Sequence, residues 1–118
     1  MIRILDFEYG FMGEADCRLQ LDTEKFTKES AQDYLDFFSW DFDKDADPVE
    51  EYMKKVAMQC IKECTFNGLS LEGVISIFEE AEGWPYIDGS VGITLLDVTP
   101  YEFDESDLEM KEKAPKQN

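Results

Sequence analysis

Apolar and polar residues alternate along the start of the chain in the way that is typical of β-strands. The alternation is regular over residues 15–22 and less regular over residues 2–9. The apolar positions of the regular stretch are Ala15, Cys17, Leu19 and Leu21. Residues 10–13 link the two stretches and contain two glycines, which tolerate the positive φ angles of tight turns. We therefore predict an N-terminal β-hairpin.

The middle of the chain changes to the spacing of amphipathic helices, with apolar residues three and four positions apart. A first helix is predicted from an N-cap at Thr27 to about Phe38. A second helix has stronger signals, because Asp47 precedes Pro48 at the first helical position and Asn67-Gly68 supplies a stop. The predicted buried face of this second helix is Val49, Tyr52, Met53, Val56, Cys60 and Cys64.

Residues 70–81 admit two interpretations. Ser70 is a good N-cap for a helix with one apolar face, closed by Gly83, whereas the β-branched residues within 74–77 favour a strand. We favour the helix. A turn-rich segment follows, and residues 91–98 are rich in β-forming side chains, so we expect them to join the sheet.

Together these elements predict an α+β fold. Its small antiparallel sheet consists of the N-terminal hairpin plus a C-terminal strand, and the helices pack on one face of that sheet. The length of 118 residues is typical of a single domain. We expect this acidic domain to span residues 1–110 and residues 111–118 to form a frayed polar tail. A fold of this class hosts many functions, so it assigns none.

The net charge is the strongest compositional signal. Asp and Glu number 28 against 11 Lys and Arg, which gives a net charge of −17, while hydrophobic residues still make up 43% of the chain. This apolar content separates the protein from disordered acidic chains, so it is expected to fold. Between Glu63 and Met110 there is no Lys or Arg, and the acids of that stretch therefore have no basic neighbour in sequence.

The sequence also predicts a location. No apolar run approaches the roughly 18 residues that a membrane-spanning helix needs. The start, MIRILDFEYG, has acids where a signal peptide has its apolar centre. The 3 cysteines lack the spacing of a secreted disulfide framework. We therefore predict a cytoplasmic protein that has no disulfide and does not bind membranes.

Catalytic and metal-binding chemistry is not favoured. Histidine is absent, which removes the commonest general base and the commonest metal ligand. Residues 41–47 alternate acids as a calcium loop does, but Ala46 replaces the turn glycine and Tyr52 replaces the bidentate Glu. Cys60 and Cys64 share a helix face and are best explained as buried small side chains. We predict no enzyme activity, no catalytic residues, no cofactor and no bound metal.

Residues 83–93 carry a family resemblance. The run GWPYIDGSVGI follows an acidic helix and precedes the closing strand. With this run in this position, the chain resembles the uncharacterised bacterial and phage family known as domain of unknown function 2528. The resemblance covers most of the chain up to about Asp107 and implies no activity.

Two classes of function fit the charge. The first is an acidic protein-binding module, in its sharpest form a DNA-mimic inhibitor or regulator of a nucleic-acid-binding protein, of the anti-CRISPR or antirestriction type. A charge of −17 equals the charge on about 29 Å of duplex DNA, and a compact domain of this length is about 35 Å across. The charge is therefore sufficient for mimicry only if it lies on one face. The alternative is an acidic protein whose charge keeps it soluble without mimicry; a small ligand-binding domain or enzyme is less favoured.

Binding would involve a basic protein surface as partner, with no direct contact to nucleic acid, because phosphate binding needs basic groups. We expect two clusters of acids and one aromatic loop to carry it. The predicted partner-binding residues are Asp41, Asp43, Asp45, Glu79, Glu80, Glu82, Trp84 and Tyr86. The first three crowd one loop, and the next three crowd a predicted helix end that no base neutralises. The oligomeric state is left open.

Overall fold

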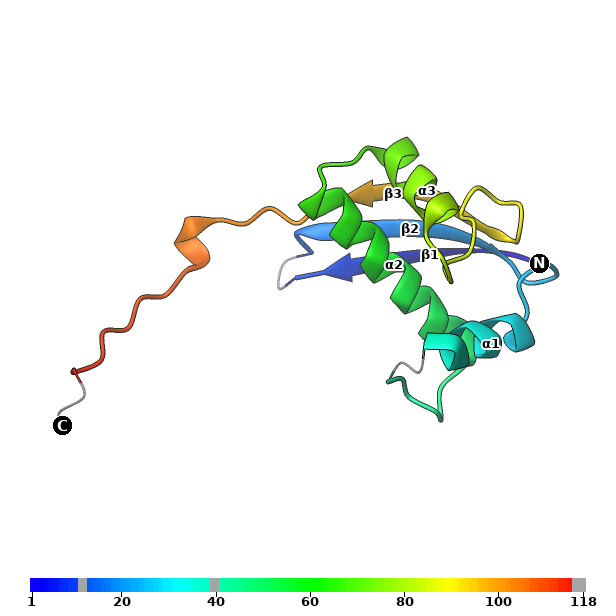
Figure 1. Ribbon diagram of the computed structural model, residues 1–118, viewed down its shortest axis with the longest axis horizontal. Helices are drawn as coiled ribbons and strands as arrows, with labels where there is room; N and C mark the ends of the chain where they lie inside the picture. The colour runs from blue at the N-terminus through cyan, green and yellow to red at the C-terminus, as the bar shows by residue number, and fades with distance from the viewer. Residues whose placement is uncertain (11–12, 39–40, 116–118) are drawn as a thin grey trace.

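The computed structural model describes residues 1–10, 13–38 and 41–115 of the chain. The elements in chain order are β1 (Ile2–Tyr9), β2 (Ala15–Asp22), α1 (Lys28–Phe38), α2 (Pro48–Phe66), α3 (Leu71–Glu80), β3 (Ile93–Thr99) and a short 3-10 turn (Glu105–Asp107). The segment after β3 leads away from the rest of the molecule (Figure 1). In the described part of the chain, no helix is long and apolar enough to cross a membrane.

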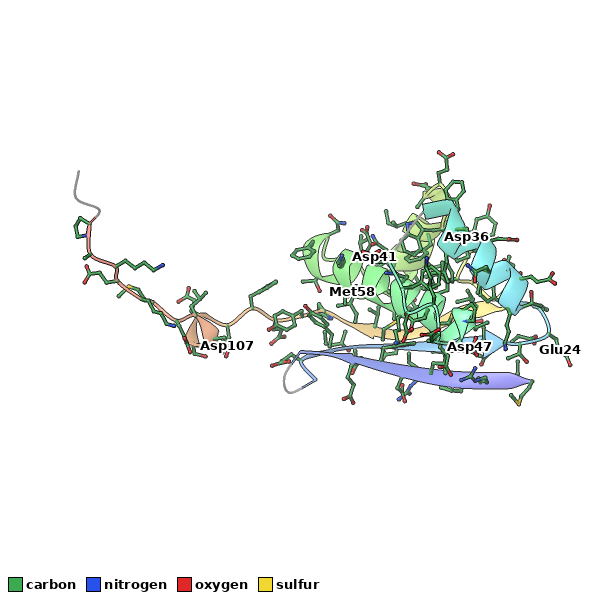
Figure 2. The ribbon with its side chains drawn as sticks, turned by 90° about the horizontal axis from the view of Figure 1, so that it is seen from below. Glu24, Asp36, Asp41, Asp47, Met58 and Asp107 are labelled. Carbon is green, nitrogen blue, oxygen red and sulfur yellow. The ribbon has the colours of Figure 1, made fainter. Side chains whose placement is uncertain are left out.

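The sheet has three antiparallel strands in the order β1-β2-β3, which confirms the predicted α+β fold. The hairpin register runs from Ile2 opposite Asp22 to Tyr9 opposite Ala15. The three α-helices of the described residues lie on one side of the sheet (Figure 2). In this part of the chain, the other face of the sheet is therefore left without a helical layer.

The pairing of β2 with β3 contains one irregularity. Leu19 pairs with Leu95, whereas the preceding Arg18 pairs with Asp97, so Leu96 is an extra residue on β3. A bulge of this kind bends the strand and redirects the side chains beyond it. Here it returns Asp97 to the same face of the sheet as Arg18.

The irregular alternation of β1 has a physical explanation. Ile2 and Ile4 lie on the face without helices, 54% and 52% exposed, while Leu5 and Phe7 pack against the core. Arg3 occupies a position on the helix-covered face, where its Nη2 donates to Glu50 Oε1 of α2 at 3.2 Å. The apolar residues of β1 thus divide between the two faces.

Helix α2 is the centre of the helical layer, because it contacts α1, α3, β2 and β3. Its start is as predicted: Asp47 Oδ1 accepts a hydrogen bond from Val49 N at 2.9 Å, and Pro48 begins the helix. Its end is also as predicted, with Asn67 as C-cap and Gly68 at a φ of 61°. The predicted face of α2 is fully confirmed as buried, and Glu51, Ala57 and Ile61 are buried with it.

The other two helices also follow their caps. Thr27 Oγ1 accepts from Ser30 N at 3.3 Å at the start of α1. Ser70 Oγ accepts from Gly73 N at 3.2 Å at the start of α3, so the helical interpretation of this segment is confirmed. The β-branched residues of α3 follow the helix because Val74 and Phe78 pack into the core.

Candidate protein-binding surface

The face of the sheet that the helices leave open is predominantly acidic. Successive side chains of a strand point to opposite faces, so the polar residues of β2 and of the second half of β1 gather there, beside the exposed Ile2 and Ile4. The exposed charged residues of this face are Asp6 and Glu8 on β1, Asp16 and Arg18 on β2, and Asp97 on β3. We call Asp6, Glu8, Asp16 and Asp97 the sheet-face acidic patch.

Arg18 stands among three carboxylates of this patch. Its Nε donates to Asp6 Oδ1 at 2.6 Å, and Asp97 is its partner on β3. The hydrogen bond to Asp6 raises the pKa of Arg18, and the charges of Asp6, Asp97 and Asp16 act in the same direction. One guanidinium offsets at most one carboxylate, so a negative charge remains on this face.

Glu8 and Asp16 form the most unfavourable pair of the patch. They are direct cross-strand partners in the β1–β2 hairpin. Like charges in such a position repel each other and destabilise the sheet. Glu8 also reaches toward the hairpin turn, since a Cβ added at Gly13 would lie 3.5 Å from Glu8 Oε2. Folding alone therefore does not favour this arrangement.

A hollow lies at the end of the sheet where β1 ends. It has a volume of about 470 Å³ and lies between Tyr9 and Gly10, the C-terminal half of α2, and the segment after β3. We call it the aromatic hollow and define its aromatic walls as Tyr9, Phe66, Tyr101 and Phe103. Phe66 and Phe103 are 70% and 73% exposed. Exposed aromatic clusters of this kind are common at binding surfaces.

Comparison with protein families identifies the chain. The family model described as "Protein of unknown function (DUF2528)" matches residues 16–110. The chain belongs to the DUF2528 family. No curated protein and no solved structure matches it. The resemblance carried by residues 83–93 is thus confirmed.

The matched part of this DUF2528 protein divides the candidate surface. Asp16, Arg18 and Asp97 lie within the matched residues, whereas Asp6 and Glu8 on β1 lie outside them. The family description assigns no activity to any of these residues. Their role has to be inferred from the structure itself.

The sequence-predicted acids of the 41–45 loop are exposed and lie just before α2 in this DUF2528 chain. Asp43 Oδ1 accepts from Asp45 N at 2.9 Å, and Lys55 Nζ donates to the backbone oxygen of Asp41 at 2.8 Å. The loop is thus organised by local hydrogen bonds and by the lysine of α2. Among the described residues, no group of three Cys, Asp or Glu side chains is placed to hold a metal ion.

The second predicted cluster surrounds the end of α3. Glu79 lines a hollow of about 260 Å³ together with Trp84 and Tyr86, so the structure brings these three residues together. Trp84 is half-buried, with its ring centroid 5.3 Å from that of Phe78, whereas Tyr86 is 48% exposed. The remaining two acids of the cluster, Glu80 and Glu82, are exposed.

The two predicted clusters do not form one surface. The loop that contains Asp41 lies below α1 in Figure 1, and α3 lies at the opposite side of the helical layer. Whether either cluster binds a partner stays a prediction. Sequence reasoning missed the sheet-face acidic patch and the aromatic hollow. The polar half of the alternation in β2, with Asp16 and Arg18, was the signal that pointed to the former.

The cysteines of the DUF2528 chain belong to the core. Cys17, Cys60 and Cys64 are buried, and their thiols are free. A hydrogen bond with Cys17 and burial raise the pKa of the Cys60 thiol, and burial raises the pKa of Cys64. The neutral thiol is thus favoured, which is the opposite of what a reactive cysteine needs.

Proposed function

We propose that this protein is an acidic protein-binding module whose partner presents a basic surface, of the kind that nucleic-acid-binding proteins have. The observation that carries the proposal is the position of Glu8 directly opposite Asp16 on the open face of the sheet. A pair of like charges costs folding stability, and proteins keep such costs mainly where a function requires them. A lysine or arginine of a partner would relieve this repulsion.

The neighbouring charges support the same proposal. Asp6 and Asp97 lie on the strands to either side of Arg18, so an incoming cation meets carboxylates from all three strands. The ion pair between Arg18 and Asp6 is solvent-exposed and contributes little to stability. It can therefore rearrange at low cost when a partner binds. Complementary charge of this kind mainly increases the association rate and the specificity.

DNA mimicry is the narrower form of the proposal. At about 3.3 Å per residue, the 8 residues of β2 span about 26 Å. A duplex of that length carries about 15 phosphate charges. The sheet-face acidic patch supplies fewer, so mimicry would also need the acids that follow β3, among them Glu102, Asp104 and Glu105. The alternative is that the charge serves solubility alone.

Affinity capture from a lysate of the organism that makes the protein separates these possibilities. The bait is used as wild type, as Glu8→Gln/Asp16→Asn, and as the control Asp33→Asn/Asp36→Asn. The control removes the same charge from α1, where both aspartates are exposed and Asp36 lies on the helical side of the molecule (Figure 2). We expect basic proteins on the wild type and the control at low salt, and their loss from the sheet-face variant.

Salt and charge controls decide the outcome. Because exposed charges are screened beyond about 8 Å at physiological ionic strength, the specific capture should weaken as salt rises. If both variants lose the same proteins equally, bulk charge explains the binding. If neither variant loses any, the open face of the sheet is not the binding surface.

A further inference from the structure

We propose that the aromatic hollow receives a cationic side chain of the partner, specifically an arginine guanidinium. This inference rests on the proposed function, because it requires a partner with a basic surface. It adds a second contact of different chemistry at the end of the same sheet. The acidic patch would attract the partner, and the hollow would hold one side chain of it.

The ring geometry favours a flat cation. The ring centroids of Tyr9 and Tyr101 lie 5.8 Å apart with an interplanar angle of 70°, and those of Tyr101 and Phe103 lie 4.9 Å apart at 69°. The ring centroids of Phe66 and Phe103 are 6.2 Å apart. Rings tilted against one another thus line one space. A guanidinium stacks on aromatic faces more readily than an ammonium does.

Hydrogen bonds hold this cluster on α2. Thr65 Oγ1 donates to Ile61 O at 2.7 Å and accepts from Tyr101 N at 2.9 Å. The segment after β3 is therefore attached to the last turns of the helix, which places Tyr101 between Tyr9 and Phe103. The walls of the hollow are built from three separate parts of the chain, and the Thr65 hydroxyl joins two of them.

Charge decides which occupant fits. A Cβ added at Gly10 would collide with the carboxylate of Glu14 and lie 3.2 Å from Tyr101 Cε2, so a carboxylate and an aromatic ring meet at the wall of the hollow. Glu102 and Asp104 flank Phe103 in sequence. An anionic ligand would be repelled, and so would a second copy of a chain with a net charge of −17. The surrounding acids therefore favour a cation, although Lys62 in the lining of the hollow opposes it.

Lys62 supplies an internal test, because it is the basic residue among those that line the hollow. Its positive charge opposes an incoming guanidinium. Lys62→Met keeps a long apolar side chain and removes that charge, so it should tighten the binding of an arginine peptide. Weaker binding by this variant would overturn the inference.

Nuclear magnetic resonance titration with a short oligoarginine peptide, and with oligolysine of equal length, tests the proposal. We expect the ring signals of the four aromatic walls to shift, and to shift less with oligolysine. Phe66→Leu and Phe103→Leu keep apolar surface but remove the π face, so each should weaken binding about two- to fivefold. Both side chains are mainly exposed, so the variants should fold. Phe37→Leu, at the exposed phenylalanine of α1, is the control.

The outcomes separate this inference from the proposed function. If the side-chain signal of Arg18 shifts but the ring signals do not, the hollow is not a receptor and the function stands. If neither signal shifts, both proposals fail. If the rings shift but the leucine variants bind equally well, the contact is apolar and the cation inference is wrong. The cation inference is also wrong if the ring signals shift when the protein is diluted without any peptide, because a second copy of the chain then occupies the hollow.

Discussion

Glu8 of β1 and Asp16 of β2 lie directly opposite each other, both exposed, on the face of the sheet that no helix covers. Two negative side chains in register across a hairpin oppose its formation. The stability of the hairpin must therefore come from its other face, where Cys17, Leu19 and Leu21 are buried against the helices. This division assigns folding to one face of the sheet and leaves the other available for binding.

The first prediction concerns this pair. Glu8→Gln removes the repulsion while keeping the shape, so the free energy of unfolding should increase by about 0.2–1 kcal/mol. Urea denaturation measures the change. The control is Glu109→Gln, which alters the net charge equally in the exposed segment after β3. An equal gain in both variants would mean that overall charge, and not the cross-strand pair, limits stability.

A second prediction tests the core. Met53 is fully buried on α2, so Met53→Ala should lower the free energy of unfolding by about 2–5 kcal/mol. Lys62→Ala, at an exposed position of the same helix, should change it little. Thermal or urea denaturation of the two variants compares them. Similar stabilities of the two variants would show that Met53 does not contribute to the packing of the core.

The cysteines give a third prediction. A hydrogen bond with Cys17 and burial raise the pKa of Cys60, and burial raises the pKa of Cys64, so the reactive thiolate is scarce in the folded protein. An aromatic disulfide reagent at mildly alkaline pH should therefore react slowly with the native protein and rapidly after denaturation. Ser106→Cys adds an exposed thiol as a positive control. Fast reaction of the native thiols would show that the core opens readily.

The local elements were predictable from sequence because their signals are local. Asp47 before Pro48 and Ser70 before Leu71 each supply a side chain that caps the helix following it, and the structure confirms both. The regular alternation of β2 likewise predicted its two faces. Where a segment carried two signals, as α3 did, burial of Val74 and Phe78 decided in favour of the helix.

The candidate surface was not predictable in the same way. The patch depends on which face of the sheet the helices leave open, and on the extra residue Leu96, which returns Asp97 to the face of Arg18. The aromatic hollow joins Tyr9, Phe66 and Phe103, which lie far apart in sequence. Sequence reasoning instead selected acids that are crowded along the chain, since local crowding is what a sequence displays.

The acids at the end of α3 give a fourth prediction. If they form a secondary contact, reversal of Glu79, Glu80 and Glu82 to Lys should weaken partner binding less than the sheet-face variant does. The fold should persist, because all three side chains are exposed and surface substitutions cost little. Association rates at low and high salt measure the effect. Unchanged affinity and unchanged salt dependence would remove this cluster from the binding surface.

The open face of the sheet is tested as the binding surface by mapping the contact of the captured basic partner by nuclear magnetic resonance, using side-chain signals that report from one face only. Arg18 Nε and the Gln20 amide lie on the open face of the sheet, whereas Gln32 of α1 and Gln59 of α2 donate to Asp36 and Glu63 within the helical layer. We predict that the first two signals shift on binding and the second two do not. Shifts confined to Gln32 and Gln59 would place the contact on the helical layer and contradict binding through the open face of the sheet.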